Sequence, residues 1–596
     1  MPYAIRPVEG LPKTTDTVGR SERHPTDWSF SMTPRTRRRV RRGSTACAAI
    51  LAGIGLMTVA PTSASADVTQ GLPSPFITTA NSSDPHAKPC TVGGQAGMCL
   101  FTSEDLNQGS VTTGYPSGQA NSYPMNRTLG YFSTDGVNWQ GPTVLMTEST
   151  YQSVGWVQSS SNPLHLWAPS AQQGTDGNWY LYVPDISDTQ HPATSSFIGV
   201  SRSTNGPMGP YTPVGKVATP GYGSDPDVVD TRSGRFGTGP QLFFADGDGS
   251  NCGGISTASL DQTDMTTIGA VTRLTFTGIP ASWGWCNDQF GRAHPYMEGP
   301  HVYNVGLGGW PSGVPGTVPG SGNYLMVVPI KPASTPSECA TSVQGQPGQP
   351  NELIAWLTAP DPTGPWTYGG ILMCGSQKEY TDQGTIIPVT TSLRTNGFSP
   401  LLFIYHDGAP TSVPGHHRAL HAECLFYGNG KLANSVRTNS GNGDLISSGA
   451  SRDCLLGFVN QWTFGLQSSA GKFLSQNGNA VLTANRSDIG PWERFGFNNG
   501  PGGSPISAVI GSNGAVTFNR ATWGTNANPG LATANNTTSA ITSTSGTNNT
   551  SLFNVTFNGA VLTMTSVQTG KGVRTVSDGT LRADATIPEQ FTIYHQ

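Results

Sequence analysis

Three acidic residues stand at points of the sequence where a rigid scaffold could hold them for chemistry. Asp84 lies in the segment SSDPHAKPC, Asp225 in GSDPDVVD and Glu298 in YMEGPHVY. Hydrolysis of a glycosidic bond needs one carboxyl group that protonates the leaving oxygen and another that activates water or attacks the sugar carbon. An Asp before Pro is also an ordinary turn residue, whereas a Glu between apolar residues and a Gly-Pro pair is harder to explain by solubility. The three residues are therefore candidates for acid–base chemistry.

The elements that must position these residues are predicted to be short strands. Between Asp84 and about Tyr427 no helical period is sustained, and short apolar segments recur with turn residues between them, roughly once every 60 to 70 residues. These segments are MCLFTS, NWYLYV, QLFFAD, NYLMVV and LLFIYH. Five such segments favour five four-stranded blades arranged radially, since that design leaves few exposed sheet edges. A β-sandwich with long loops is the alternative that strand periodicity alone does not exclude.

The last part of the chain, from about Cys454, changes to a texture rich in Gly, Asn, Ser and Thr. It repeats three times, and each unit ends in an aromatic pair: Phe495 and Phe497, Phe553 and Phe557, Phe591 and Tyr594. Each unit is too small to bury its own apolar face, which favours a β-trefoil of three units. We therefore expect an all-β protein with a leader over residues 1–66, a five-bladed β-propeller over 67–453 and a β-trefoil over 454–596.

The composition excludes several classes of partner. Of the 596 residues only 11% are charged, 76 are Gly and 46 are Pro, and the formal net charge is -4. Neither a basic nor an acidic excess is present that would attract nucleic acid or an anionic membrane, so a neutral partner such as a polysaccharide or oligosaccharide fits better. We expect a monomer that binds neither nucleic acid nor membrane.

The N-terminal segment has the pattern of a secretory signal. The basic stretch TRRRVRR is followed by the apolar ACAAILAGIGLMTVA and then by Ala64-Ser65-Ala66. The apolar run is shorter than the roughly 20 residues that span a bilayer, which disfavours a retained anchor. Met32 is an alternative start, and the Arg41-Arg42 pair leaves a twin-arginine export route open. The expected location is extracellular.

Export predicts disulfide bonds among the cysteines that remain once Cys47 is removed with the leader. Closeness along the chain favours four pairs: Cys90 with Cys99, Cys252 with Cys286, Cys339 with Cys374, and Cys424 with Cys454. The sequence has no CxxC pair, which argues against a zinc site.

The acidic segments, in this order and each ahead of a blade strand, resemble glycoside hydrolase family 43 over roughly residues 75 to 435. The segments that carry the likeness are Asp84-Pro85-His86 for the first blade, Trp167-Ala168-Pro169 with NWYLYV for the second, SDPDVVD with FFADGDG for the third, Glu298-Gly299-Pro300 for the fourth, and DQGTIIPV, LLFIYHDG and GHHRALHAECLFYGNGKL for the fifth.

The resemblance implies an inverting mechanism in which Asp84 is the general base, Glu298 the general acid and Asp225 the pKa modulator that also orients the acid. The negative charge of Asp225 would disfavour ionisation of Glu298. The carboxyl groups of the base and the acid are expected roughly 6.5 to 9.5 Å apart, since a water molecule must fit between them.

The resemblance also bears on metal and sugar binding. His406 matches a histidine that helps to hold a calcium or sodium ion near the propeller axis in many members of the family, although no cofactor is required; a simply hydrogen-bonded buried His is the alternative. Trp167, Trp283 and Trp285 are candidates for stacking on sugar rings, with core packing as the alternative for Trp167.

In the C-terminal part, VLTANRSDIGPWERFGF over residues 481–497 resembles the repeat of fascin-like β-trefoils. The residues that carry this likeness are Asn485, Arg486, Gly490, Pro491, Trp492, Glu493 and Phe495. Behind a glycosidase, such a domain is interpreted as a carbohydrate-binding module that raises the local substrate concentration. A stabilising appendage without a ligand is the alternative.

The expected activity within the family is α-L-arabinofuranosidase on arabinose- or xylose-containing plant polysaccharides. β-Xylosidase, endo-arabinanase and galactan-cleaving activities share the same three carboxylates and stay open as alternatives. Retaining invertase-like enzymes also have five blades and three carboxylates, but they show a Glu-Cys acid where this sequence has MEGP. A non-catalytic glycan-binding protein would have no need of the three carboxylates.

Overall fold

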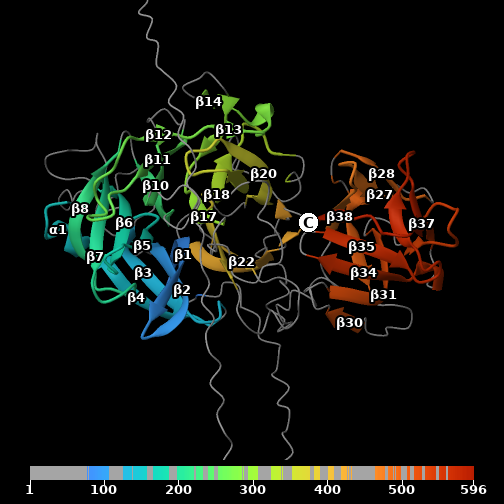
Figure 1. Ribbon diagram of the computed structural model, residues 1–596, viewed down its shortest axis with the longest axis horizontal. Coiled ribbons are helices and arrows are strands. Elements are labelled where there is room, and N and C mark those ends of the chain that lie inside the picture. The colour runs from blue at the N-terminus through green and yellow to red at the C-terminus, as the bar shows by residue number, and fades with distance from the viewer. Residues whose placement is uncertain are drawn as a thin grey trace, which may run out of the picture. The chain divides into compact units, whose positions relative to one another are not determined.

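The protein is all-β in every part that the structure describes (Figure 1). The computed structural model describes residues 77, 80–105, 125–156, 166–186, 197–231, 239–246, 253–305, 324–339, 352–375, 381–388, 401–408, 418–432 and 464–595, apart from short gaps within these ranges. The predicted leader and the predicted boundary between residues 453 and 454 lie outside the described residues. In the described part, no helix is long and apolar enough to cross a membrane.

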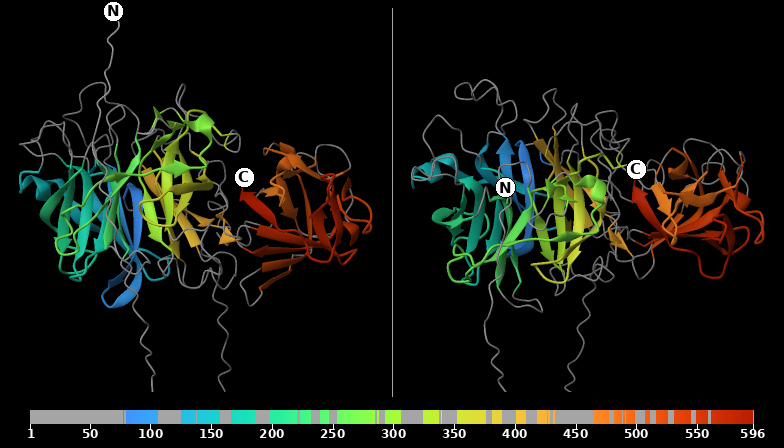
Figure 2. Two further views of the ribbon diagram at one scale, coloured as in Figure 1. Left: turned by 45° about the horizontal axis from the view of Figure 1, so that its top comes forward. Right: turned by 90° about the horizontal axis from the view of Figure 1, so that it is seen from above.

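Five consecutive antiparallel sheets form the first domain, a five-bladed β-propeller (Figures 1 and 2). The first contains β1 (Ser82–Val92), β2 (Gln95–Asp105), β3 (Met125–Ser133) and β4 (Gln140–Thr147) in that order, and the short helix α1 (Glu148–Gln152) follows it. The second contains β5 (Ser170–Gln173), β6 (Trp179–Ile186), β7 (Phe197–Ser203) and β8 (Thr212–Ala218). The third contains β9 (Ser224–Asp230), β10 (Pro240–Ala245), β11 (Ile255–Ser259) and β12 (Thr272–Arg273).

The fourth and fifth blades depart from the simple four-stranded order. The fourth contains β13 (Phe276–Thr277), β16 (Tyr296–Met297), β17 (His301–Asn304), β18 (Tyr324–Lys331), β19 (Leu353–Ala359) and β20 (Trp366–Met373); β16 and β17 both pair with β18, and β13 runs parallel to β20. The fifth contains β21 (Gly384–Pro388), β22 (Leu401–Gly408) and β23 (Arg418–Leu425). Beside these sheets lie the 3-10 helix η2 (Ala281–Trp283) and two small hairpins, β14 (Cys286–Asn287) with β15 (Ala293–His294) and β24 (Tyr427–Gly428) with β25 (Lys431–Leu432).

Each pair of neighbouring blades shares a hydrophobic core, because side chains alternate between the two faces of a strand. In β6, Tyr180 and Tyr182 pack with the third blade, whereas Trp179 and Leu181 pack with the first. The fifth blade packs on the first through residues such as Leu402 and Leu100, so the cores close into a ring. The five apolar segments predicted from the sequence fall in β2, β6, β10, β18 and β22, the second strand of four blades and the central strand of the fourth. The five-bladed prediction is confirmed, and the β-sandwich is excluded.

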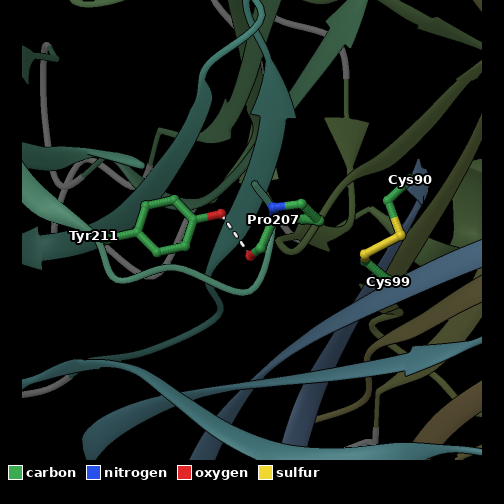
Figure 3. The surroundings of a disulfide bond; sticks show 4 residues. All are labelled: Cys90, Cys99, Pro207 and Tyr211. Carbon is green, nitrogen blue, oxygen red and sulfur yellow. Dashed lines mark hydrogen bonds between the residues drawn. A yellow bond between two sulfur atoms is a disulfide. The ribbon is translucent and has the colours of Figure 1, made fainter. Parts of the chain in front are cut away.

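Two of the four predicted disulfides lie in the described part of the chain. Cys90 bonds to Cys99 between β1 and β2 (Figure 3), and Cys339 bonds to Cys374. The first bond belongs to the core between blades one and two, which also contains Tyr211, whose hydroxyl donates to the Pro207 carbonyl at 2.8 Å. The side chains needed for the other two predicted pairs lie outside the described residues.

The second domain is a closed, barrel-like sheet. Its ring runs through β26 (Phe464–Gln467), β29 (Phe495–Asn498), β31 (Val516–Thr525), β34 (Phe553–Asn558), β35 (Val561–Ser566) and β38 (Phe591–His595), which pairs back with β26. The remaining strands are β27 (Phe473–Ser475), β28 (Thr483–Arg486), β30 (Ser507–Ile510), β32 (Leu531–Thr533), β33 (Thr542–Thr544), β36 (Gly572–Thr575) and β37 (Leu581–Ala585), with short 3-10 helices η4 (Pro491–Glu493) and η6 (Asn549–Ser551).

The three predicted repeats occupy corresponding places in this barrel. The first aromatic residue of each pair, Phe495, Phe553 and Phe591, begins a ring strand and is fully buried in one core. Three hairpins, β27 with β28, β32 with β33 and β36 with β37, are joined to one another by isolated bridges. The structure thus establishes a barrel-like sheet built from repeats.

Candidate active site

A pocket lies where the inner strands of the five blades begin. Its lining residues are Asp84, Pro85, His86, Ala168, Pro169, Asp225, Pro226, Gly299, Pro300, His301, Gln383 and Gly384. Every blade contributes, so the pocket lies on the propeller axis. A pocket at this position is rigid, because each wall is the start of a strand packed into a blade.

Four of the blades begin at the pocket with the same backbone device, a residue of positive φ followed by Pro. The residues are Asp84 (φ 51°), Ala168 (φ 35°), Asp225 (φ 50°) and Gly299 (φ 53°). For a residue other than Gly, this conformation costs about 1 to 3 kcal/mol and persists where the surrounding structure enforces it. The strand register slips beside Asp84 and beside Asp225, so both form bulges that turn their side chains toward the axis. The Asp-Pro pairs are therefore strand bulges and not turns.

Asp84 is held by two basic side chains from the fifth blade. The Arg418 guanidinium contacts both carboxyl oxygens, with Nη1 2.8 Å from Oδ1, and a second fork of the same guanidinium binds Asp105 at 2.9 and 3.0 Å. The Asp84 amide donates to His406 Nδ1 at 2.9 Å. Burial alone would raise the pKa of Asp84, but the charge of Arg418 and the contact with His406 hold the pKa below its usual value. Asp84 is therefore ionised.

Asp225 lines the same pocket, and Glu298, which precedes the pocket-lining Gly299, is close enough for its charge to act on Asp225. The Gly299 amide donates to the Asp225 carboxylate, which fixes the loop that carries Glu298. Burial and the neighbouring charges of Glu298 and Asp84 raise the pKa of Asp225 well above its usual value. The hydroxyl of Tyr296 donates to Glu298 Oε2 at 2.5 Å, so one carboxyl oxygen of Glu298 has a fixed donor. The structure thus brings the three predicted carboxylates together.

A layer of buried polar residues begins two positions further along the inner strands, at His86, Asp227 and His301. Asp227 Oδ1 accepts from His86 Nε2 at 2.7 Å and from Lys88 Nζ at 2.8 Å, and Asp227 Oδ2 accepts from the Val302 amide at 2.6 Å. The His86 ring stacks on His301 at 4.1 Å between centroids. Burial alone would raise the pKa of Asp227, but Lys88 and His86 hold it well below its usual value. Asp227 is an anion paired to an ammonium.

The family resemblance implies a metal ion near the axis, and the donors present there do not fit one. His86, Asp227 and His301 lie close enough together to share an ion. However, the Lys88 ammonium already neutralises Asp227 and would repel a second cation. His406 also differs from the prediction, because its Nδ1 accepts from Asp84 and its Nε2 lies 2.8 Å from the Thr381 carbonyl. With both ring nitrogens engaged, His406 acts as a hydrogen-bond partner of Asp84.

The three predicted tryptophans have different outcomes. Trp283 is buried in the core between blades three and four, edge-on to Tyr368 at 5.6 Å, so the prediction that it stacks on sugar is wrong. Trp167 is partly exposed and immediately precedes Ala168 of the pocket, and its stacking role stays a prediction. Trp285 lies outside the described residues.

The sequence interpretation missed the charges that hold the site together. Arg418, Asp105 and Lys88 are each less than a tenth exposed, and each makes an ion pair or hydrogen bond with another blade or strand of the site. The signal available was a charged residue inside an apolar strand segment, since charged residues are seldom buried unless they are paired. What the sequence does not give is the partner, which for Arg418 and Asp84 lies 334 residues away.

The fold and the site together define a hydrolase of glycosidic bonds. Residues 119–310, which include Asp225 and Glu298, match the family described as Glycosyl hydrolases family 43. The chain is thus a glycoside hydrolase, and the family that residues 119–310 match inverts the configuration of the sugar. A comparison with curated proteins finds no match.

Several solved structures are similar to this chain at low identity. A family 43 enzyme from Xanthomonas citri in complex with xylose is 18% identical, with 62% of this chain and 94% of that one covered and a TM-score of 0.40. A β-xylosidase/α-arabinofuranosidase from a compost microbial metagenome, with xylotriose and in calcium-free form, is 17% identical, with 62% and 98% covered and a TM-score of 0.41. An exo-β-1,3-galactanase from Clostridium thermocellum is 12% identical, with 88% and 98% covered and a TM-score of 0.37.

Proposed function

We propose that this hydrolase cleaves its substrate with inversion of the anomeric configuration. Asp84 is the general base, Glu298 the general acid and Asp225 the pKa modulator. The observation that carries the proposal is that Asp84 and Asp225 line one axial pocket and that the charges of Asp84 and Glu298 both act on Asp225. Asp84 takes a proton from water while the water oxygen bonds to the anomeric carbon, and Glu298 gives its proton to the departing glycosidic oxygen. The proton on Asp84 then returns through solvent to Glu298, and both carboxyl groups are restored.

The electrostatics of the pocket support these opposite roles. Arg418 keeps Asp84 ionised, as a base must be before the reaction, and it holds the carboxylate in one orientation. Burial and the charge of Glu298 raise the pKa of Asp225 well above its usual value, so the site holds a proton beside Glu298. One carboxyl group is thus prepared to accept a proton and another to give one.

The proposed substrate is a plant cell-wall polysaccharide that contains arabinose or xylose, and the proposed activity is α-L-arabinofuranosidase. The family match supports the substrate class. β-Xylosidase, endo-arabinanase and galactan cleavage are the competing activities.

Glu298→Gln tests the assignment directly. The variant should lose about 10²- to 10⁴-fold of kcat on a natural oligosaccharide and much less on an aryl glycoside, whose leaving group needs no proton. Proton NMR of the first-formed sugar should show the inverted anomer. Full activity of the variant on the oligosaccharide would refute the acid assignment, and a panel of aryl pentosides identifies the sugar that is cleaved.

We further propose that the C-terminal domain is a fascin-like β-trefoil that binds glycan, and that the protein is secreted. The closed ring of strands and its three linked hairpins support the trefoil. The disulfides support export, because such bonds persist in oxidising compartments. Affinity electrophoresis of the full chain through gels with and without arabinoxylan tests glycan binding, and equal mobility in both gels would contradict it.

A further inference from the structure

A second carboxyl group, that of Glu352, lies close to Glu298 in the fourth blade. The residues opposite one another in adjacent strands place it there: Tyr296 of β16 faces Lys331 of β18, and Glu352 immediately precedes β19, whose Leu353 faces Ile330. Lys331 Nζ lies 2.9 Å from Glu352 Oε1 and 5.2 Å from the centre of the Tyr296 ring. Tyr296, Lys331 and Glu352 therefore form one row that ends beside the proposed acid.

Glu352 is almost completely enclosed, with 1% of its surface exposed. The Asp382 amide donates to Glu352 Oε2 at 2.7 Å, so a donor stands at each carboxyl oxygen of Glu352. A hydrogen bond joins the Glu352 carboxyl to that of Glu298. An ionised carboxyl group can only accept hydrogen bonds, so this bond requires a proton on one of the two groups.

We propose that Glu298 and Glu352 share one proton and that Glu352 is a positioning residue for the acid. The inference rests on the proposed role of Glu298. Lys331 and the Asp382 amide donate to Glu352 and hold its carboxyl group in place beside Glu298. Without Glu352, Glu298 would lose the neighbour with which it shares the proton.

The charges in the row support the shared proton. Burial and the charge of Glu298 raise the pKa of Glu352 well above its usual value, and Lys331 opposes that rise. Burial alone would lower the pKa of Lys331, but Glu352 and Glu298 raise it, so Lys331 stays charged. Two interacting carboxyl groups lose their protons in two separate steps, and the second step belongs to the pair. The pair therefore keeps one proton to a higher pH than a single carboxyl group would.

Other titratable groups also lie near Glu298 and Glu352. Tyr296 is on β16, and the charge of Glu298 raises its pKa, so it stays a neutral donor. Asp225, on β9, interacts electrostatically with Glu298. Asp382, in the segment before β21, interacts in the same way with Lys331. None of these groups is altered by a substitution at Glu352, so their influence is common to the native enzyme and the variant.

Glu352→Gln is the decisive variant, because it keeps the shape of the side chain and removes its charge. The alkaline limb of the kcat profile on a natural oligosaccharide should move to lower pH by about one unit or more, since the like charge that delays loss of the shared proton is gone. The limb should move much less with an activated aryl glycoside. An unchanged alkaline limb in the folded variant would overturn the proposal.

Lys331→Met should move the same limb in the opposite direction, to higher pH, because it removes the cation that favours ionisation of the pair. Infrared difference spectra give a second readout that needs no turnover. Just above the pH optimum, the native enzyme should show protonated-carboxyl absorption that both Glu352→Gln and Glu298→Gln lack. Shifts of the same sign in the Lys331 and Glu352 variants, or identical spectra, would contradict a shared proton.

The matched control is Glu493→Gln, a buried Glu of the C-terminal domain, which should leave the profile unchanged. A shift in this control would show that the effect is not specific to the row and would overturn the proposal. The underlying role of Glu298 is tested separately. If Glu298→Gln is fully active, the proposed function fails, whereas inactive Glu298→Gln with an unshifted Glu352→Gln profile refutes the shared proton alone.

Discussion

The interiors of the two domains are stabilised by different interactions. The propeller contains buried acidic residues that are paired with cations, in the groups Asp84 with Arg418 and Asp105, Asp227 with Lys88, and Glu352 with Lys331. The core of the C-terminal barrel is formed by apolar side chains, and Glu493 is the one buried acidic or basic residue in the described part of that domain. Burying a charge costs several kcal/mol unless a partner compensates it. The protein bears that cost where chemistry requires ionised groups.

This comparison predicts that the axis is sensitive to changes of charge and the barrel to changes of volume. Activity should depend on the first and be indifferent to the second. Four experiments test the contrast.

Asp84→Asn should have the largest effect, a loss of about 10³-fold or more in kcat/KM on a natural oligosaccharide, because the proposed base cannot take a proton from water. Steady-state kinetics measures the loss, with Glu493→Gln as the control that should keep full activity. Full activity of Asp84→Asn would exclude this residue as the base.

Lys88→Met should destabilise the propeller by about 3 to 5 kcal/mol, because it leaves the Asp227 carboxylate buried without its cation. Denaturant unfolding measures the change, and hydrogen exchange should localise it to peptides of β1 and β9. Native stability in this variant would mean that Asp227 does not need the ammonium.

Leu562→Ala should destabilise the barrel by about 2 to 5 kcal/mol, since Leu562 is fully buried in its core. The increased exchange should appear in peptides of β34 and β35, and kcat on aryl glycosides should not change. A loss of kcat equal to that of an axial variant would break the contrast between the domains.

Asp225→Asn should have the smallest effect on stability, a gain of about 1 kcal/mol at neutral pH. The folded pKa of Asp225 is raised, so the native protein loses stability as pH rises from the unfolded value through the folded one. The variant has no such loss, and its advantage should vanish well below pH 4, where both states of the native residue are protonated. Unfolding curves at several pH values measure the difference, and an equal gain at pH 4 and pH 7 would contradict the ionisation mechanism.

The blade strands and the three carboxylates could be predicted because their signals are local. A segment such as QLFFAD is apolar on both faces, and each acid precedes a strand of this kind. The charge partners could not be predicted, because Arg418 meets Asp84 only after the fifth blade closes on the first. The same reason explains Trp283, whose environment is set by Tyr368 of a later strand. Disulfides between neighbouring cysteines, such as Cys90 and Cys99, were predictable from short separation.

The residues of positive φ that precede Pro occupy equivalent positions around the propeller axis. In four blades this position lines the same pocket, and it is occupied by Asp84, Ala168, Asp225 and Gly299. The scaffold therefore fixes the positions, and the residue type at each position decides whether it supplies charge or space. A change of chemistry in such a protein therefore requires substitutions at these positions and no change in the arrangement of the blades. Ala168 is the position at which a substitution would add a further functional group to the pocket.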